Sequence, residues 1–333
     1  MKRLLNIFLA VVLVVACAFS LTGCKTPDEN GDKKEGVLIK KENNVYVIYD
    51  YVDDGKLTDG ELNLGTILEE RQISQAKIKS GAFDGADNIR TLIVPDTVVE
   101  IQAGAFRKMS NLVELQIPFV GLNAKADAQH EETDEIEGKA VDNERTIAHF
   151  FGTEEYEGGA TLTNEFGTYY LPHTLTTVIV NATNNVDYTI EGVKEGYAIP
   201  MGAFEGATSL LNIEITGDNL KEIGERAFSG CTALTTISVP SSVNKIYSYA
   251  FYGCQNLKEV QIKGTDVELG IEVFAGCVKM DKLNSEVALT VDLSAFSSID
   301  KGALDFGREK VEFNVLNKGT FNLDNIFGET KFK

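Results

Sequence analysis

The chain has 333 residues, of which 43% are hydrophobic and 24% are charged, and its formal net charge is -19. This composition is ordinary for a folded domain. The acidic excess argues against nucleic acid as a partner, because no basic stripe is present to neutralise phosphates, and against adsorption of the protein surface to anionic lipid. A partner recruited by charge should therefore be basic.

Residues 1–23 have the pattern of a lipoprotein signal peptide. Two positive residues precede an apolar run over residues 4–19, and Leu-Thr-Gly-Cys follows at residues 21–24. A short apolar run behind positive charge is typical of a secretory signal. The ending resembles the bacterial lipobox, and this resemblance implies that Cys24 is acylated and becomes the mature N-terminus. An uncleaved anchor, or a plain signal with a chance cysteine, is the alternative.

The signal predicts a lipid-anchored protein of the bacterial cell envelope, exposed on the outer surface, with membrane contact through the N-terminal lipid only. Residues 24–36 are polar and charged, which predicts a disordered tether. Residues 37–72 are expected to form an N-terminal cap. Strand-like runs on either side of Asn43 and Asn44 predict a β-hairpin within this cap.

A sequence pattern recurs between residues 73 and 286. In each copy an aliphatic residue precedes a Phe by five positions, and a Gly usually follows the Phe by two. A segment of the form L-x-x-L-x-L begins eleven residues after the aliphatic residue. The copies start 23 residues apart, except for one step of 24 and one large gap, which hides a further copy at residues 175–180. The aliphatic residues and their partners are Ile78 and Phe83, Ile101 and Phe106, Ile199 and Phe204, Ile223 and Phe228, Ile246 and Phe251, and Leu269 and Phe274.

This periodicity predicts a repeat solenoid. One rung is too small to bury its own apolar face, whereas stacked rungs turn each apolar position into a continuous column. The L-x-x-L-x-L segments predict a parallel β ladder of about seven rungs, roughly 30 Å long. The Phe residues should stack as a buried spine, and the Gly residues should provide turns with positive φ. Lys108 replaces that Gly in one copy, so its turn is expected to differ.

The repeat resembles the BspA-type leucine-rich repeat of bacterial surface proteins. The string Ile223-Gly-Glu-Arg-Ala-Phe-Ser-Gly-Cys-Thr-Ala-Leu-Thr-Thr-Ile-Ser-Val-Pro carries the resemblance, and residues 150–178 resemble a longer module of the same family. The resemblance implies a leucine-rich-repeat solenoid over residues 73–286. We expect little helix, and β-rich caps at both ends, because strand-like runs flank the repeats. It also implies a secreted or surface-attached protein, as members of the family typically are. Some members are associated with adhesion to host proteins and other cells, and the resemblance supplies no enzymatic site.

Two regions depart from the repeat. An insertion is predicted at about residues 119–170, and its acidic run at residues 127–137 is expected to be a solvated loop, with a calcium or basic-partner site as the alternative. Residues 287–333 are expected to form a C-terminal cap, because they contain strand-like runs at 289–293 and 311–315 without the repeat.

Three cysteines, Cys231, Cys254 and Cys277, occupy one repeat position. Other copies have Ala or Met there, so we expect buried free thiols, with a disulfide or a metal site as alternatives. His130, His149 and His173 are the only histidines and belong to no catalytic or zinc motif, and His173 is expected to be a turn residue. We therefore predict no enzyme activity, no cofactor and no metal site.

The outward positions of the L-x-x-L-x-L segments should form two polar columns, interrupted by Ile93 and Ile179. We predict that the protein is a surface-anchored binding or adhesion module, and that this face recognises a basic or hydroxyl-rich protein or glycan. A structural scaffold of the envelope without a specific host ligand is the alternative. The predicted partner-binding residues are Thr91, Glu114, Gln116, Thr177, Asn212, Glu214, Thr236, Ser238, Glu259 and Gln261.

Overall fold

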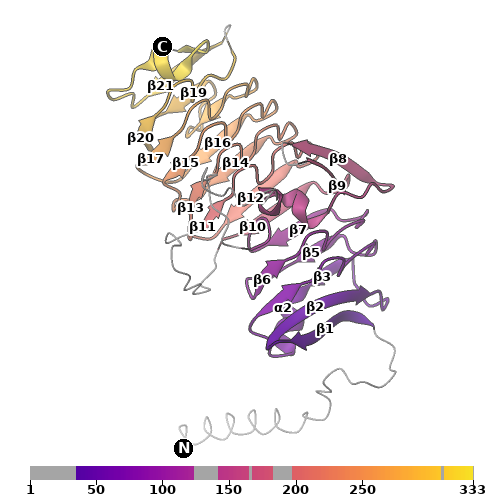
Figure 1. Ribbon diagram of the computed structural model, residues 1–333. Helices are drawn as coiled ribbons and strands as arrows, with labels where there is room; N and C mark the ends of the chain where they lie inside the picture. The colour runs from indigo at the N-terminus through magenta and orange to yellow at the C-terminus, as the bar shows by residue number, and fades with distance from the viewer. Residues whose placement is uncertain (1–34, 124–141, 165–166, 183–196, 309–310, 333) are drawn as a thin grey trace, which may run out of the picture.

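The computed structural model describes residues 35–123, 142–164, 167–182, 197–308 and 311–332. In these ranges the chain winds into a solenoid whose rungs stack from an N-terminal hairpin to a C-terminal group of strands (Figure 1). The predicted signal peptide, Cys24, most of the tether and the acidic run at residues 127–137 lie outside these ranges. None of the helices within them is both long and apolar enough to cross a membrane.

The L-x-x-L-x-L segments form a first parallel ladder, as the repeat predicts. All seven predicted rungs form strands of this ladder, and four further strands extend it, so it contains a five-stranded sheet and a six-stranded sheet. Strands without the repeat sequence continue the ladder into both regions that were expected to be caps. In chain order, the strands are β3 (Glu61–Asn63), β5 (Thr91–Ile93), β7 (Glu114–Ile117), β10 (Thr177–Asn181), β12 (Asn212–Thr216), β14 (Thr236–Val239), β16 (Glu259–Ile262), β18 (Lys282–Leu283), β19 (Thr290–Asp292), β21 (Glu312–Leu316) and β22 (Lys331–Phe332).

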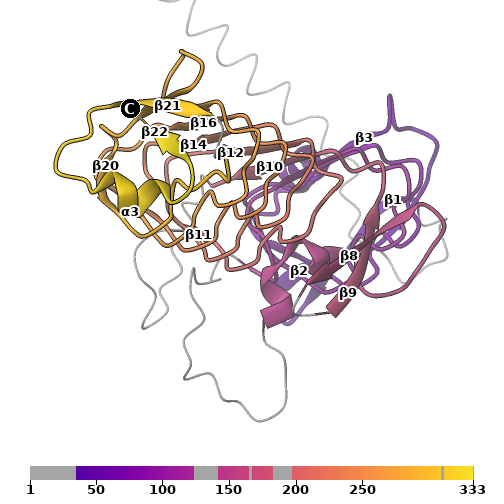
Figure 2. The same cartoon turned by 90° about the horizontal axis from the view of Figure 1, so that it is seen from above.

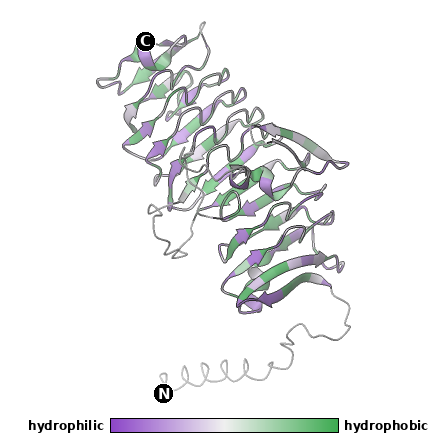
Figure 3. Cartoon of the chain, in the orientation of Figure 1, coloured by the Kyte–Doolittle hydropathy of each residue, from purple (hydrophilic) through white to green (hydrophobic). Residues whose placement is uncertain are grey.

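A second parallel ladder, which the sequence did not predict as strands, contains the aliphatic residue that opens each copy. Its strands are short, and several place a charged residue beside this aliphatic residue, so they carry little strand periodicity. The strands are β4 (Ala76–Ile78), β6 (Val98–Ile101), β11 (Tyr197–Ile199), β13 (Leu220–Ile223), β15 (Lys245–Ile246), β17 (Val267–Leu269) and β20 (Phe296–Ile299). Figure 3 shows hydrophobic and hydrophilic residues interleaved along the rungs of both ladders.

The N-terminal end contains the predicted hairpin. Strands β1 (Gly36–Glu42) and β2 (Val45–Val52) pair antiparallel, and β2 joins β4 in the second ladder. Asn43 and Asn44 have φ values of 46° and 67°, as a two-residue turn with both central residues left-handed requires. Helix α2 (Leu64–Glu70) follows β3 and is capped by Asn63, whose side chain accepts hydrogen bonds from two backbone amides of the first turn.

The predicted Phe spine is confirmed. Between the two ladders, each rung makes a turn whose backbone amides donate to the next rung. The Phe228 N–H, for example, donates to the Ala250 carbonyl at 2.8 Å. Phe228 is fully buried, and its ring lies parallel to the rings of Phe204 and Phe251, with centroids 5.3 and 5.0 Å away. Phe251 stacks in the same way on Phe274, at 5.2 Å.

The turns that follow the spine are left-handed in every copy. The Gly residues at this position have positive φ, as predicted, with values such as 70° at Gly230 and 68° at Gly253. Lys108 also has a positive φ, of 58°, so the expectation that its turn differs is wrong. The position is open in some copies, because a Cβ built on Gly85 or Gly253 meets no atom within 4 Å, whereas one built on Gly206 would lie 3.3 Å from the Thr163 carbonyl oxygen. Lysine therefore fits here sterically, at the conformational cost that an L-residue has in this region.

The insertion fills the gap in the repeat with its own elements. They are η1 (Asp142–Arg145), η2 (Ile147–Phe150) and the antiparallel hairpin of β8 (Gly159–Asn164) and β9 (Gly167–Pro172). The Phe106 N–H donates to the Phe150 carbonyl at 2.8 Å, so η2 takes the place of a rung turn. The hairpin projects from the side of the solenoid in both views (Figures 1 and 2).

The C-terminal end closes the stack with a helix. Helix α3 (Leu323–Phe327) lies beyond the last turn, where the Leu304 N–H donates to the Ile326 carbonyl at 2.8 Å. Phe327 is fully buried and contacts the ring of Phe306, with centroids 6.3 Å apart. The helix thus covers the end of the column of aromatic residues. Strands β21 and β22 extend the first ladder at the same end of the solenoid.

Candidate binding surface

The outward residues of the first ladder form two columns. In the first column, Thr177 lies opposite both Glu114 and Asn212, and Thr91 lies opposite Glu114. Farther along the same column, Thr236 lies opposite Glu259. The second column is built in the same way from the residues two positions farther along each strand: Ile93, Gln116, Ile179, Glu214, Ser238 and Gln261. All ten predicted partner-binding residues therefore lie on this surface, which we call the strand face.

Burial separates the strand face from the core. Ile213, Ile237 and Val260 point inward and are at most 4% exposed. Their neighbours on the strand face are half-buried or exposed, and the exposed ones gather on β12 and β14. The side chains that a partner could reach most easily are therefore Asn212, Glu214, Thr236 and Ser238.

Neighbours on the same face already engage two of the three carboxylates. Gln116 Nε2 donates to Glu114 Oε1 at 2.8 Å, and Lys282 Nζ lies 3.4 Å from Glu259 Oε2. Glu214 makes no such contact with any residue that the structure describes. Unused hydrogen-bonding capacity on the strand face is thus concentrated near β12.

The first ladder is interrupted beside Glu214. β12 ends one sheet and β14 begins the next, and the two strands are not paired. A hollow of about 450 Å³ opens at this point, which we call the break cleft. It is lined by Asn212, Glu214, Thr216, Thr236, Ser238 and Lys263, together with Pro240, Ser241 and the backbone between them.

One extra residue coincides with the break. The step of 24 residues separates Ile199 from Ile223, and the extra residue lies in the turn after β12. There Thr216 and Gly217 stand where three other copies have a single Pro, at Pro95, Pro118 and Pro240. β12 consequently continues alongside β10, and the Ala182 N–H donates to the Thr216 carbonyl at 2.8 Å. The irregular step was visible in the sequence, but its consequence for strand pairing was not predicted, and neither was Lys263.

The chemistry of the break cleft is polar and nearly neutral. Asn212, Thr236 and Ser238 provide amide and hydroxyl groups, and none of them bonds to another side chain in the described residues. Glu214 adds one carboxylate and Lys263 adds one ammonium group. Such a lining can donate and accept hydrogen bonds at several points, as a hydroxyl-rich ligand or a polar polypeptide requires.

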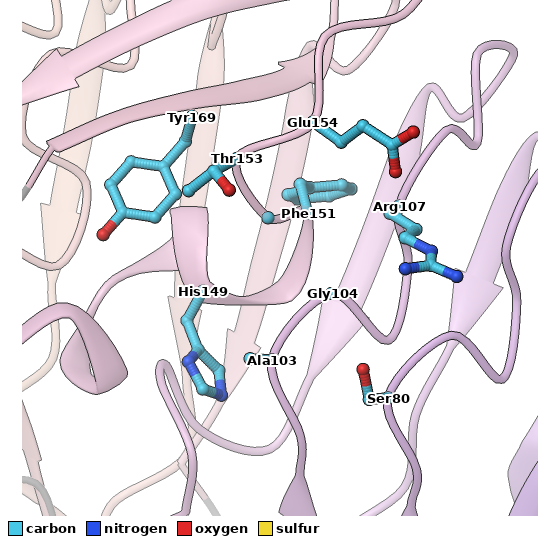
Figure 4. A pocket seen from close by; sticks show the side chains of 10 residues that line it. Ser80, Ala103, Gly104, Arg107, His149, Phe151, Thr153, Glu154 and Tyr169 are labelled. Atoms are coloured by element: carbon cyan, nitrogen blue, oxygen red, sulfur yellow. The ribbon is translucent and has the colours of Figure 1, made fainter.

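A second hollow, of about 320 Å³, lies between the rung turns and the insertion (Figure 4). Its charged groups are engaged, because Arg107 pairs with Asp84 at 2.8 Å and Lys108 pairs with Glu154 at 2.7 Å. His149 is buried, and its Nε2 lies 3.0 Å from the Ile101 carbonyl oxygen. Burial lowers the pKa of His149 and keeps the ring neutral. This hollow therefore offers a partner fewer unengaged hydrogen-bonding groups than the break cleft does.

The thiols of the repeat are buried and free, as predicted. Cys231, Cys254 and Cys277 are fully buried and unpaired, and each S–H donates to the carbonyl of a spine Phe at 3.1–3.2 Å. Burial raises the pKa of Cys231 and Cys277 well above the ordinary value, which disfavours a reactive thiolate. In the described part of the chain, no three His, Cys, Asp or Glu side chains lie where they could hold a metal ion.

His173 lies at the base of the β8–β9 hairpin. It is exposed, and its Nδ1 lies 2.8 Å from the Gly158 carbonyl oxygen. This contact joins two loop segments, in agreement with the expectation of a turn residue. His130 lies outside the described residues.

Comparison with known proteins identifies the repeat. The model of the BspA type leucine rich repeat region matches six copies at residues 70–126 and 189–309, which is more than half of the chain. Among curated proteins, none is similar enough to match.

Solved structures of leucine-rich repeat proteins share 16% identity with the chain. A protein from Bacteroides ovatus aligns over 92% of this chain and 77% of its own, with a TM-score of 0.35. A protein from T. pallidum aligns over 76% and 91%, with a TM-score of 0.28. A leucine rich cell surface protein from Faecalibacterium prausnitzii aligns over 88% and 89%, with a TM-score of 0.26. The six matched repeat copies cover more than half of the chain, and the chain therefore belongs to the BspA-type leucine-rich repeat family.

Proposed function

We propose that the protein is a surface-anchored binding module that recognises a protein or glycan partner through the strand face, centred on the break cleft. The observation that carries this proposal is the meeting of Asn212, Glu214, Thr236 and Ser238 around one hollow, with polar groups that no other side chain engages within the described parts of the chain. Elsewhere on the face, Glu114 and Glu259 are occupied by Gln116 and Lys282.

The scaffold favours binding because its geometry is fixed before a partner arrives. The strand residues follow buried positions that pack into one continuous core, so their backbone loses little freedom on association. The side chains of the cleft suit hydroxyl groups, amides or a single basic group. A hydroxyl-rich glycan or a polar, basic polypeptide fits this lining better than an apolar ligand.

The proposed location follows from the N-terminal sequence. Acylation of Cys24 would hold the solenoid at the bacterial envelope, with the residues after it as a tether. Replacing Cys24 with Ser should abolish incorporation of radiolabelled fatty acid by intact cells. Undiminished labelling of the Cys24→Ser protein would contradict the anchor.

The binding proposal is tested with two matched triple variants of the soluble protein that begins after Cys24. The cleft variant changes Asn212→Ala, Glu214→Gln and Ser238→Ala, and the face control changes Thr91→Ala, Thr177→Ala and Gln261→Ala. Each exposed or half-buried substitution should change the free energy of unfolding by less than about 0.5 kcal/mol. The parent and both variants are applied to a glycan array and to immobilised extracellular-matrix proteins.

We expect the cleft variant to lose binding to the ligand that the parent recognises, and the face control to retain it. If both folded variants bind as the parent does, the break cleft is not the binding site. If the parent recognises neither class of ligand, the result favours the alternative role of an envelope scaffold.

A further inference from the structure

One backbone position of every rung is left-handed, and it is usually glycine. This position lies two residues before the spine residue, on the turn that connects the second ladder to the first. Three consecutive rungs break the rule, because they have Arg226, Tyr249 and Glu272, with φ values of 54°, 60° and 50°. The other rungs have Gly81, Gly104, Gly202 and Gly302.

These exceptions carry a conformational cost that glycine would avoid. An L-residue in the left-handed region crowds its Cβ against the backbone, and a bulky residue such as Tyr249 is a marked outlier there. The four glycines of the same column show that the fold accepts glycine at this place. The scaffold requires a left-handed backbone at this position, but it does not require a side chain. A non-glycine residue kept here despite its cost therefore points to a role for its side chain.

Two of these side chains, Arg226 and Tyr249, belong to one partly exposed cluster, in which Arg226 also lies 3.6 Å from Glu205. The guanidinium of Arg226 lies over the ring of Tyr249, 5.8 Å from its centroid, and the ring of Tyr252 meets Tyr249 edge-on at 5.9 Å. Tyr252 is 47% exposed and Ile271, on the next rung, is 41% exposed. We call Arg226, Tyr249, Tyr252 and Ile271 the tyrosine patch. It follows strands β13, β15 and β17, whereas the strand face belongs to the first ladder (Figure 1).

The tyrosines have no polar role within the described fold. Neither the Tyr249 hydroxyl nor the Tyr252 hydroxyl bonds to another described residue. Exposed aromatic rings beside an arginine have the composition of an interaction hot spot, in which Tyr and Arg are enriched. We infer that the tyrosine patch is a second interaction surface, which binds an arginine-bearing segment of a partner protein.

Charge and ring geometry favour arginine as the occupant. No cation of the described residues lies over the ring of Tyr252, whereas Arg226 already occupies Tyr249. Glu225 and Glu272 stand at the same turns and form no ion pair with any described residue. A guanidinium can stack on an aromatic face and bond to a carboxylate at the same time, which an ammonium does less well. The net charge of -19 adds a general attraction for a basic segment.

The test uses an unstructured fluorescent peptide of alternating Arg and Gly, with a matched peptide in which neutral citrulline replaces each Arg. Binding is measured by fluorescence anisotropy with the soluble protein and with Tyr249→Gly and Tyr252→Ala. Both substitutions conserve the net charge, so a loss of binding would not come from a change in general electrostatic attraction. Tyr252→Ala removes a tyrosine side chain without introducing glycine, which controls for the added backbone freedom of Tyr249→Gly. Gln72→Gly is the control, because Gln72 is also left-handed, with φ 56°, and lies after helix α2 in the N-terminal cap.

We expect Tyr249→Gly and Tyr252→Ala each to weaken binding of the Arg peptide by about tenfold. Gln72→Gly and the cleft variant should bind it as the parent does, which separates this surface from the proposed function. Tyr249→Gly should also melt no lower than the parent, since glycine relieves the left-handed backbone.

Several results would overturn the inference. Unchanged binding by both tyrosine variants, or equal binding of the citrulline peptide, would exclude an arginine site. A melting temperature lowered by several degrees in Tyr249→Gly would show that the tyrosine supports the fold. Self-association of the parent in sedimentation, lost in Tyr252→Ala, would identify a second copy as the occupant. Displacement of the Arg peptide by a neutral oligosaccharide would identify a glycan instead.

Discussion

Phe228→Ala is the most direct test of the aromatic spine. Phe228 is fully buried between two parallel rings, at 5.3 Å from Phe204 and 5.0 Å from Phe251. Truncation of a buried Phe destabilises by about 3–5 kcal/mol, because transfer free energy is lost and a cavity remains. The rungs above and below hold the backbone of this turn through amide hydrogen bonds, so the site can collapse little. We therefore expect a value near the upper end of that range.

The assay is chemical denaturation of the soluble protein, followed by circular dichroism. Val287→Ala is the control, because Val287 is 66% exposed and its loss should cost less than about 0.5 kcal/mol. A double variant adds a second test. Phe228→Ala with Phe251→Ala should be non-additive, since the rings touch, whereas Phe228→Ala with Phe83→Ala should be additive within about 0.5 kcal/mol. A Phe228→Ala midpoint equal to that of the parent would refute the reasoning.

Three further predictions follow from buried groups and tight turns. In the soluble protein after Cys24, a thiol reagent should label no cysteine before denaturation and Cys231, Cys254 and Cys277 after it; labelling of only one would reveal a disulfide. Gly121→Ala should lower the free energy of unfolding by more than about 2 kcal/mol, because its φ is 92° and the new Cβ would lie 2.3 Å from the Glu144 carbonyl oxygen. The control, Gly85→Ala, places its Cβ in open space and should cost about 1 kcal/mol, so equal melting temperatures of the two variants would contradict the prediction. Burial lowers the pKa of His149, so the unfolded chain binds a proton at a higher pH than the folded protein, and stability should fall as pH drops below about 6.5. His149→Gln should reduce the fall in melting temperature between pH 7.5 and 5.5, and an unchanged fall would show that His149 does not cause it.

The periodic parts of the fold could be predicted because each rung repeats the same burial. Phe204, Phe228 and Phe251 recur at one position, and they stack. Cys231 and Cys254 share a position with alanines, and they are buried and unpaired. The pattern identifies such residues because a column requires the same kind of side chain on every rung.

The strands that carry no repeat were predicted only in part: the strand-like runs at residues 289–293 and 311–315 correspond to β19 and β21, but their place in the first ladder was not predicted. β19 and β21 pair in register with the rung before them, although neither contains the L-x-x-L-x-L pattern. The last rung of a ladder offers unpaired backbone groups, and a following segment can satisfy them with a short apolar alternation alone. The second ladder was missed for a similar reason, since β15 consists of Lys245 and Ile246 only.

Lys108 shows the limit of reading a turn from one residue. The absence of Gly suggested another turn, yet the backbone is left-handed there as in the other copies. Hydrogen bonds to neighbouring rungs and the buried Phe106 fix this turn, and they outweigh a local cost of roughly 1–2 kcal/mol.

The candidate residues of the strand face were predicted because they alternate with the core. Their concentration around a break was not predicted.

The break itself leads to a final prediction. Deleting Gly217 restores the regular step of 23 residues, so the turn after β12 should approach the geometry of the turn at Pro240. β12 could then pair with β14, and the break cleft would close. We expect slower hydrogen exchange of amides in residues 212–216 and 236–239, with loss of the binding that the cleft variant loses. Gly217→Asn is the control, because it keeps the length and Asn tolerates the observed φ of 89° better than most residues. If the deletion variant folds with unchanged exchange in both strands, the extra residue does not cause the break.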